Sequence, residues 1–188
     1  MPRVKLFDKN EAIKQAMELF WEKGYEATSL NDLTEHLGIG KGSFYATFES
    51  KENLFNQCIE TYTESNLPLL DQALQTEQNF KMGLQKLLEA YVEGLMNDQK
   101  RKGCFMANSC ALVNTQNAGI EKKIYEHYQR IEQYLATTME KNGINSTKAK
   151  SISAMIVTFL IGMSQQSKIN RDTASYLTTV KNIVGLLD

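Results

Sequence analysis

Proline and cysteine are scarce in this chain of 188 residues, which holds only two prolines and three cysteines. An odd number of cysteines without framework spacing excludes a disulfide-stabilised secreted scaffold and is typical of reduced thiols. The longest apolar run, residues 154–163, is too short to span a bilayer, and the first nine residues are too polar for a secretory signal. We therefore expect a cytoplasmic protein that has no membrane partner.

Histidine is equally rare, which argues against a metal site or an enzyme. The only two are His36 and His127, and neither stands at metal-ligand spacing from Cys, Asp or Glu. The alternative from another functional class is a helical thiol enzyme that uses Cys104 and His127. Nucleophilic catalysis needs a base that a third group holds near the thiol, and no spacing in the sequence provides one. We expect no catalytic residue, no metal and no cofactor.

Acidic residues are missing from one short stretch, and this absence is the most informative. Between residues 38 and 48 there is no Asp or Glu, while Lys41, Ser43 and Tyr45 offer hydrogen-bond donors. A helix that faces solvent would carry carboxylates, and a core helix would alternate apolar positions. This composition is typical of a helix that lies against phosphates and base edges in a DNA major groove. Residues 28–55 therefore predict two short helices joined by a glycine turn.

Composition and periodicity predict the fold class. Two prolines, 42% hydrophobic residues and long helix-period patterns indicate an all-α protein. We expect an N-terminal three-helix helix-turn-helix DNA-binding domain over residues 1–50 and a C-terminal helical ligand-binding and dimerisation domain over residues 51–188. Asp8 and Ser50 are the expected caps of the first and fourth helices, and Pro68 is expected to bend or end the fourth.

The charge balance predicts a local rather than a general attraction to DNA. The formal net charge is -1, and residues 1–60 hold seven Lys and Arg against ten Asp and Glu. DNA-binding domains are usually basic, so the positive field must be confined to the N-terminal arm, Lys41 and Lys51. Few phosphate contacts predict modest non-specific affinity and a shallow salt dependence.

The stretch from Gly38 carries a specific motif, which reads G-I-G-K-G-S-F-Y-A-T-F-x-S-K-E-x-L-F. It closely resembles the DNA-binding domain of the TetR (tetracycline-repressor) family of bacterial transcription regulators, in which the run reads like G-V-S-K-G-x-L-Y-x-H-F-x-S-K-E-x-L. The first helix matches as well, from Ala16, with A-x-x-L-F-x-x-K-G-Y-E-A-T-S. The resemblance covers about a quarter of the chain, residues 9–55, and the rest fits in length and helix count. One departure is Thr47, where the family often carries His.

Motif position and side-chain chemistry together indicate which residues contact DNA. Lys41 can reach a guanine edge or a phosphate at the start of the recognition helix, and Gly42 allows close approach. Thr28, Ser29 and Lys51 stand at helix starts, where N–H and hydroxyl groups suit a phosphate. The full set of expected DNA contacts is Arg3, Thr28, Ser29, Lys41, Gly42, Ser43, Tyr45, Thr47 and Lys51.

A second stretch, residues 101–110, reads R-K-G-C-F-M-A-N-S-C, and the family often carries a similar glycine-cysteine-hydrophobic run. A thiol just past a glycine at a helix start and close to two cations favours the thiolate, so Cys104 is a candidate sensor of electrophiles or oxidants. The other reading is that Cys104 and Cys110 are small buried apolar residues. Their spacing disfavours a direct disulfide, and both readings stay open.

The resemblance also implies a ligand cavity inside the helical body, although Tyr and Met at helical spacing are more often simply core. The helix from Ser50 past Tyr62 would connect this cavity to the DNA-reading module. The residues expected to line it are Tyr62, Tyr91, Cys104, Asn108, Tyr125, Tyr128 and Phe159.

These observations predict a ligand-responsive transcriptional repressor. A small inducer, largely apolar or electrophilic, would release it from a palindromic operator in double-stranded DNA, with thiol-based redox or electrophile sensing through Cys104 as the alternative. We expect a homodimer through the last two helices, because their apolar residues exceed what one monomer can cover. Those residues are Ile152, Met155, Ile156, Phe159, Leu160, Val180, Ile183, Val184 and Leu187.

Overall fold

The computed structural model describes residues 7–75, 79–112 and 118–188, and every regular element among them is a helix. The predicted all-α fold is therefore confirmed. None of the described helices has both the length and the hydropathy needed to cross a bilayer. The order along the chain is α1 (Lys9–Lys23), α2 (Leu30–Leu37), α3 (Lys41–Phe48), α4 (Lys51–Gln75), α5 (Phe80–Asn97), α6 (Phe105–Ser109), a 3-10 helix (Cys110–Leu112), α7 (Ala118–Lys141), α8 (Ser146–Gln166) and α9 (Thr173–Gly185).

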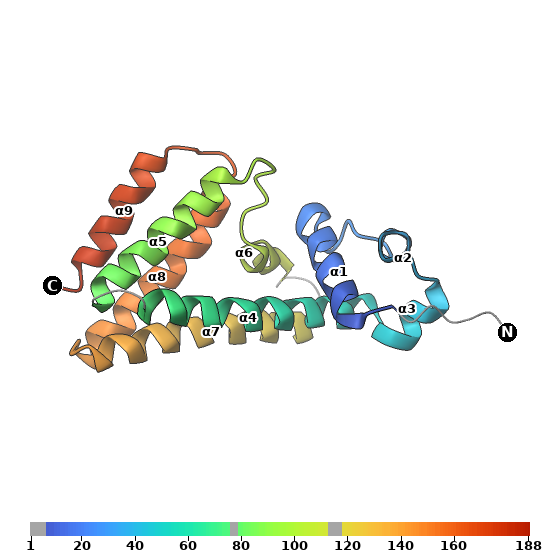
Figure 1. Cartoon of the computed structure of the whole chain (residues 1–188), viewed down its shortest axis with the longest axis horizontal. Coiled ribbons are helices and arrows are strands. Elements are labelled where there is room, and N and C mark those ends of the chain that lie inside the picture. The colour runs from blue at the N-terminus through green and yellow to red at the C-terminus, as the bar shows by residue number, and fades with distance from the viewer. Residues whose placement is uncertain (1–6, 76–78, 113–117) are drawn as a thin grey trace.

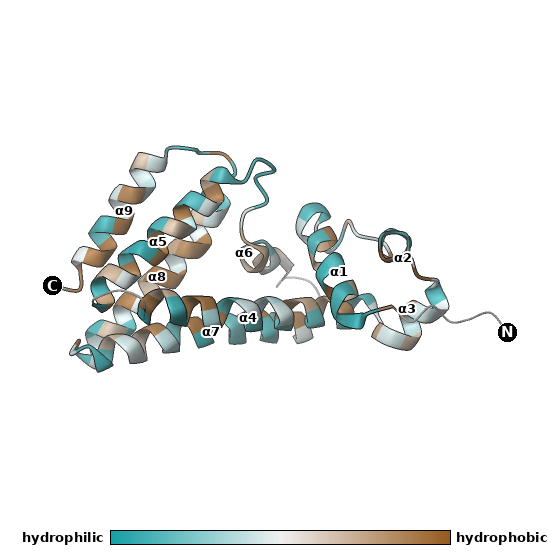
Figure 2. Ribbon diagram, viewed as in Figure 1, coloured by the Kyte–Doolittle hydropathy of each residue, from teal (hydrophilic) through white to brown (hydrophobic). Residues whose placement is uncertain are grey.

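Two groups of helices lie at opposite ends of the molecule, and the long α4 runs from one to the other (Figure 1). The first group, α1 to α3, surrounds a core that contains Phe20, Leu33 and Phe44. The second group, α5 with α7, α8 and α9, surrounds a separate core that contains Leu88 and Leu135. Individual helices carry both hydrophobic and hydrophilic positions (Figure 2), as expected of amphipathic helices that each cover a core on one side.

The N-terminal core extends beyond the first three helices. The expected boundary between residues 50 and 51 stays a prediction, but the packing shows that the first turns of α4 fold with the helix-turn-helix. A part of α6 and the beginning of α7 also join this core. The contributing residues outside α1 to α3 include Leu54, Phe55, Cys58, Ile59, Phe105, Met106, Ile120 and Ile124.

Local capping determines where the first and fourth helices begin. The Asp8 carboxylate accepts hydrogen bonds from the N–H groups of Asn10 at 2.8 Å and Glu11 at 3.3 Å. The Ser50 hydroxyl oxygen accepts one from the Asn53 N–H at 3.0 Å. Both groups satisfy N–H donors that have no partner within the helix, and both predicted caps are confirmed.

Pro68 does not end the fourth helix, so that part of the prediction is wrong. It is exposed and lies inside α4, which continues to Gln75. A proline removes only one backbone N–H from the helix, and α4 buries Ile59 before it and Leu74 after it.

The last two helices do not form the self-contained apolar hairpin expected for dimerisation. Instead α9 packs mainly against α5, and α8 packs against α7 (Figure 1). The monomer therefore covers most of the residues assigned to the dimer seam, and that assignment is wrong for those it buries. Met155, with 43% of its surface exposed, remains on the outside of α8, whereas the half-buried Phe159 packs at the edge of the C-terminal core. The buried ones are Ile152, Ile156, Val180, Ile183 and Val184.

Candidate DNA-binding face and ligand cavity

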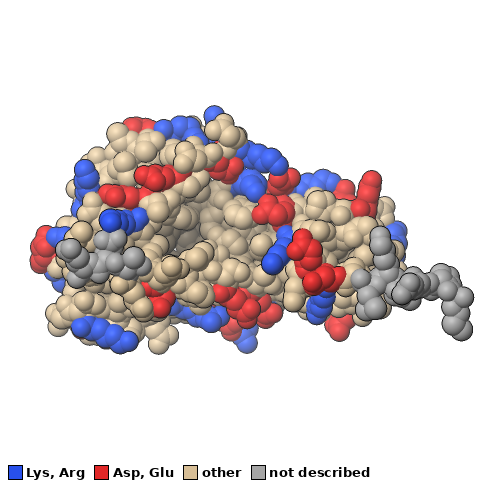
Figure 3. All heavy atoms as spheres, viewed as in Figure 1, with Lys and Arg blue, Asp and Glu red and all other residues tan. Residues whose placement is uncertain are grey.

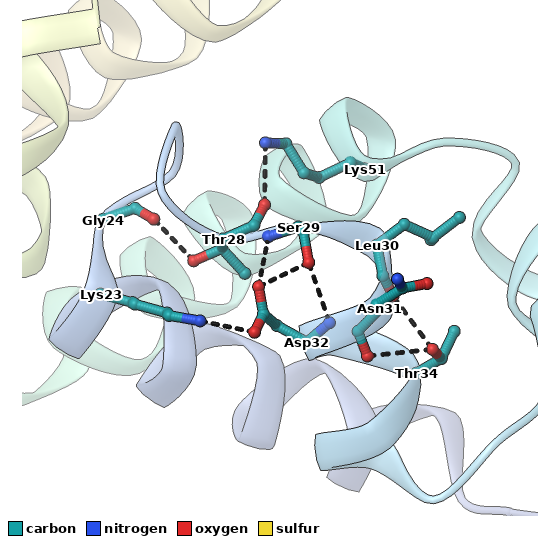
Figure 4. Close-up of polar contacts among 9 residues, drawn as sticks. All are labelled: Lys23, Gly24, Thr28, Ser29, Leu30, Asn31, Asp32, Thr34 and Lys51. Carbon is teal, nitrogen blue, oxygen red and sulfur yellow. Dashed lines mark hydrogen bonds and ion pairs between the residues drawn. The ribbon is translucent and has the colours of Figure 1, made fainter.

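A tight polar network holds the beginning of α2 (Figure 4). Ser29 caps α2, because its hydroxyl oxygen accepts the Asp32 N–H at 3.1 Å while the Asp32 carboxylate accepts the Ser29 N–H at 2.7 Å. The hydrogen bond from Lys23 and those from Ser29 hold the pKa of Asp32 well below its usual range. A carboxylate therefore already occupies the anion-binding position that we expected Ser29 to offer to a phosphate.

After the glycine turn, α3 lies with one side in the core and the other side in solvent. Gly38 adopts the left-handed conformation (φ 63°), which glycine reaches without strain. Phe44 and Phe48 are fully buried, whereas Tyr45 is 52% exposed. Lys41, Gly42 and Ser43 are also exposed, and Thr47 is half-buried. Apart from its two chain neighbours and the nearby backbone of its own helix, no atom of the described chain lies within 4 Å of a Cβ placed on Gly42, so the surface there is open to a close partner.

Two expected phosphate contacts are directed into the protein instead. Thr28 is fully buried, and its hydroxyl donates to the Gly24 carbonyl at 2.6 Å. The Lys51 ammonium donates to the Thr28 carbonyl at 3.0 Å (Figure 4). It also donates to the Tyr25 carbonyl at 2.9 Å and lies 4.2 Å from the centroid of the Tyr25 ring. Both residues hold the α1–α2 loop in this conformation, so we assign them a structural role.

Among the described residues on the face shown in Figure 3, positive charge does not gather into one broad patch. On the face shown in Figure 3, Lys and Arg side chains are interspersed with Asp and Glu. Lys23 pairs with Asp32, and Lys102 pairs with Glu18. Arg3 lies outside the described residues. An attraction to DNA would therefore be local and centred on Lys41, as the charge balance predicts.

A network of contacts fixes the loop before α6 against α1. The Trp21 indole N–H donates to the Gly103 carbonyl at 3.2 Å, and the Lys102 ammonium reaches both the Glu18 carboxylate at 2.9 Å and the Trp21 ring at 4.6 Å from its centroid. Close by, Lys100 pairs with Glu22. The loop that ends at the N-cap of α6 is thus attached directly to α1.

A cavity of about 170 Å³ lies between α4, α5, α6, α7 and α8. Figure 3 shows a hollow in the surface at the level of α4 and α5. Most residues that line the cavity are apolar. Its polar residues lie on α4, α5 and α7 and at the start of α6. The lining residues are Tyr62, Asn66, Leu67, Leu69, Leu70, Leu87, Leu88, Tyr91, Cys104, Ala107, His127, Tyr128, Ile131, Leu135, Ile156, Leu160 and Ile161.

Four of the seven expected ligand residues, Tyr62, Tyr91, Cys104 and Tyr128, line this cavity. The other three point elsewhere. Tyr125 is 63% exposed on α7, and Phe159 packs at the edge of the C-terminal core. The Asn108 amide N–H donates to the Lys102 carbonyl at 2.7 Å, and its oxygen accepts hydrogen bonds from Lys168 and Gln165.

Sequence reasoning missed several lining residues that helical spacing could have found. Asn66 lies one turn beyond Tyr62, and Ile131 and Leu135 lie one and two turns beyond Tyr128. His127 was considered only as a metal ligand or a catalytic base. The sequence did not indicate that His127 lines the cavity, because it stands next to Tyr128 and neighbouring residues on a helix usually face different directions.

Hydrogen bonds hold Cys104 and two cavity tyrosines in place. The Tyr62 hydroxyl lies 3.3 Å from Cys104 Sγ, and the Cys104 N–H donates to Ser164 Oγ at 2.7 Å. The Tyr91 hydroxyl donates to the Leu160 carbonyl at 3.3 Å. Burial raises the pKa of Tyr62 and Tyr91 far above the ordinary phenol value, so both hydroxyls stay protonated.

The structure does not pair Cys104 with His127 as a nucleophile and base. His127 is 4% exposed, and its Nδ1 lies 2.9 Å from the Thr63 hydroxyl on α4. Burial, with the nearby Arg130 charge, lowers the pKa of His127 to about 4. Within the described ranges, no three His, Cys, Asp or Glu side chains come together as metal ligands would.

Two family models match this chain. Residues 12–58 match "Bacterial regulatory proteins, tetR family", and residues 82–182 match "Transcriptional regulator LmrA/YxaF-like, C-terminal domain". The first region holds the helix-turn-helix with the start of α4, and the second holds α5 to α8 and most of α9. The second match alone spans more than half of the chain.

Similar proteins are described as bacterial regulators. The HTH-type transcriptional repressor ComR of Escherichia coli is 31% identical over 134 residues, which are 71% of this chain and 64% of ComR. The uncharacterised HTH-type transcriptional regulator YezE of Bacillus subtilis is 34% identical over 109 residues, or 58% of this chain and 56% of YezE. The matched part thus spans less than two thirds of either relative.

Solved structures share the whole fold. A cysteine mutant of the TetR family transcriptional regulator CifR, complexed with 26-base-pair double-strand operator DNA, superposes with a TM-score of 0.82 at 25% identity, over 98% of both chains. The reduced form of Escherichia coli NemR has a TM-score of 0.80 at 19% identity, over 92% of this chain and 94% of NemR. The arrangement of helices in Figure 1 is therefore one that known proteins adopt.

Proposed function

We propose a specific function from one premise: the chain belongs to the TetR family of bacterial transcriptional regulators. It is accordingly a DNA-binding transcriptional regulator and not an enzyme. We infer that it is a repressor, that it works in the cytoplasm, and that a small ligand in the cavity releases it from its operator. The name of the relative ComR, a transcriptional repressor, supports the direction of control.

The acid-free exposed side of α3 is the observation that carries this proposal. Lys41, Ser43 and Tyr45 project donors from a helix whose opposite side is anchored by two buried phenylalanines. Such a helix suits base edges and phosphates in the major groove, and Gly42 leaves room for the DNA backbone. The half-buried Thr47 would add a secondary contact, whereas the Asp32 carboxylate already engages the Ser29 hydroxyl and N–H at the start of α2. The operator complex of CifR supports this use of the fold.

We propose a homodimer in which the outer side of α8 meets its own copy. From Ser151 to Gln166 this helix holds no charged residue, and Met155, Thr158 and Gly162 are exposed. An uncharged face sixteen residues long is unusual for a helix side that meets only water. Twofold symmetry of the dimer then requires a pseudo-palindromic operator, with half-sites roughly 34–36 Å apart.

The switch would operate through the two connections between cavity and DNA-reading module. One is α4, which begins in the N-terminal core at Leu54 and lines the cavity from Tyr62. The other is the loop held by the Trp21–Gly103 hydrogen bond. A ligand lowers DNA affinity only if it binds the DNA-incompetent arrangement more tightly. Movement of either connection would change the separation of the two recognition helices and weaken both half-sites together.

Covalent sensing through Cys104 is a second candidate, because its thiol lies in the cavity next to the Tyr62 hydroxyl. Alkylation replaces the S–H by an S–C bond and adds bulk against α4. Treatment with iodoacetamide, which loses iodide while the thiol proton passes to the buffer, should then release operator DNA from the wild type and from Cys110→Ser but not from Cys104→Ser. Equal release in Cys104→Ser would leave a reversible ligand as the mechanism.

Retardation of DNA that flanks the gene itself tests the proposed function. The purified protein should shift this DNA in a salt-sensitive manner, and Lys41→Ala should weaken the shift. Lys141→Ala is the matched control, because Lys141 is an exposed cation at the end of α7 far from α3 (Figure 1). Equal binding by the wild type and Lys41→Ala would show that α3 does not read the operator.

A further inference from the structure

The short helix α6 lies between the cavity and the N-terminal core. Cys104, at its N-cap, and Ala107 line the cavity. Phe105 and Met106, which are 1% and 0% exposed, belong to the N-terminal core instead. Residues three positions apart on a helix share one side, and their neighbours face other directions. This stretch of backbone is therefore a wall that the cavity and the core of the DNA-reading module have in common.

Phe105 stands at the centre of a cluster of aromatic rings. The centroid of its ring lies 5.5 Å from those of Phe55 and Tyr62 and 6.0 Å from that of Trp21. Rings at these separations are in contact. Phe55 lies near the beginning of α4, Tyr62 lies on its cavity wall, and Trp21 belongs to α1. A displacement of Phe105 must therefore displace α1, the beginning of α4, or both.

The contacts continue from Phe55 to the beginning of α2. The Tyr25 ring lies 4.8 Å from the Phe55 ring between centroids, and the Lys51 ammonium lies over the Tyr25 ring. The same ammonium donates to the Thr28 carbonyl at 3.0 Å, just before α2. Closely packed interiors contain few voids that could absorb a displacement, so they transmit it. An unbroken series of contacts thus joins the cavity wall to the helix-turn-helix.

Among the helices that line the cavity, α6 has the least structure to resist pressure. It spans five residues, whereas α4, α5, α7 and α8 span 25, 18, 24 and 21. Hydrogen bonds join Cys104 to Ser164 and Asn108 to Lys168, and they keep one side of α6 on α8 and the residues that follow it. A molecule that fills the cavity would then turn α6 toward α1 and α4, between which Phe105 is placed.

We propose that α6 is the moving part of the switch and that Phe105 transmits the filling of the cavity to α1 and the beginning of α4. Phe105 is a positioning residue, because it acts on DNA binding only through Phe55 and Trp21. With the cavity empty, its ring holds the arrangement that binds DNA, and a displaced α6 favours the arrangement that does not. This role of α6 rests on the proposed function, in which the cavity controls DNA affinity.

A cavity-filling substitution tests the role of α6 in the full chain without any added ligand. Ala107→Leu places an isopropyl group on the cavity side of α6, and it should weaken binding of the DNA fragment about tenfold, since overpacking is relieved in the arrangement that does not bind DNA. Ala107→Ser keeps the size and should bind like the wild type. If Ala107→Leu does not fold, Ala107→Val replaces it with an expected loss of about threefold. Unchanged affinity in the folded cavity-filling variant would overturn the proposal.

A double-mutant cycle tests the assignment to Phe105. Phe105→Leu removes the ring that reaches Phe55 and Trp21, so Ala107→Leu should weaken DNA binding only about twofold or less in this background. Met106→Leu is the matched control, because Met106 is equally buried in the N-terminal core, and it should keep the tenfold loss. If the Phe105→Leu variants do not fold, Phe105→Met replaces them. A structural role alone would lower stability but leave the loss unchanged, and an equal loss in both backgrounds would refute the assignment.

Binding by the wild type separates the two levels of failure. Absence of salt-sensitive retardation of the DNA by the wild type would refute the proposed function and the role of α6 with it. If the wild type binds the fragment but Ala107→Leu weakens binding equally with and without the Phe105 ring, the proposed function stands and the transmission through Phe105 is wrong.

Discussion

Replacing Lys51 by methionine should destabilise the fold, because its ammonium group satisfies two carbonyls of the α1–α2 loop. The two hydrogen bonds, to Tyr25 and Thr28, have lengths of 2.9 and 3.0 Å. A hydrogen bond from a charged donor contributes about 1.5–3 kcal/mol, and water can replace part of this when the carbonyls become accessible. Methionine keeps the packing of the aliphatic stem. We expect the free energy of unfolding to fall by about 1–3 kcal/mol.

Urea unfolding followed by far-ultraviolet circular dichroism measures this change. Protein concentration must be the same for each variant, because the stability of a dimer depends on it. Lys41→Met is the control, since Lys41 is exposed on α3 and a surface substitution changes stability by about 0.5 kcal/mol or less. Suppose that Lys51→Met unfolds like the wild type while its DNA affinity falls and its salt slope decreases by about one unit. Lys51 would then be the phosphate contact that motif position suggested.

Three further results are expected. Lys41→Ala and Tyr45→Ala should each weaken operator binding by about 1–3 kcal/mol in a retardation assay, without changing the urea midpoint. Met155→Glu should give soluble monomers by light scattering, because Met155 is exposed, whereas Ile183→Asp should unfold the protein, because Ile183 is buried in the monomer; a dimeric Met155→Glu would rule out the proposed seam. Burial lowers the pKa of His127 from 6.5 to about 4. Between pH 6.5 and 4 the unfolded chain therefore binds a proton on this side chain that the folded chain does not bind. Stability should be complete above pH 6.5 and fall by about 3 kcal/mol as the pH falls to 4, and a pH titration of unfolding should lose this part in His127→Gln.

Features set by neighbouring residues could be predicted from the sequence. The caps at Asp8 and Ser50 and the all-helical fold depend on a few residues of local spacing, and they are confirmed. The helix that begins at Lys41 follows from local composition for the same reason, while its role in reading DNA stays a prediction. Pro68 was misjudged because tertiary packing can override even the local preference against a proline inside a helix, which is about 3 kcal/mol.

Features set by tertiary packing could not be predicted in the same way. Motif position indicates that Thr28 and Lys51 matter, but not whether their polar atoms face DNA or the protein interior. Tyr62 and Tyr128 were expected in the cavity on the basis of a family resemblance, whereas His127 joins them only through the crossing of α4 and α7. Ile183 was assigned to a dimer seam because an apolar helix side cannot reveal which helix covers it.

The hydrogen bond between Trp21 and Gly103 has an optical consequence. Trp21 is the only tryptophan in the chain, so its indole emission arises from one place, the contact between α1 and the loop at the rim of the cavity. Tyr62 and Phe105 lie about its ring with centroid separations of 6.0 Å, and the Lys102 ammonium lies over it. Any shift of the loop relative to α1 changes the polarity around the indole and its hydrogen bond, and therefore its emission maximum. The protein thus contains its own fluorophore for following, without an attached dye and in real time, whether events in the cavity reach the helices that read DNA.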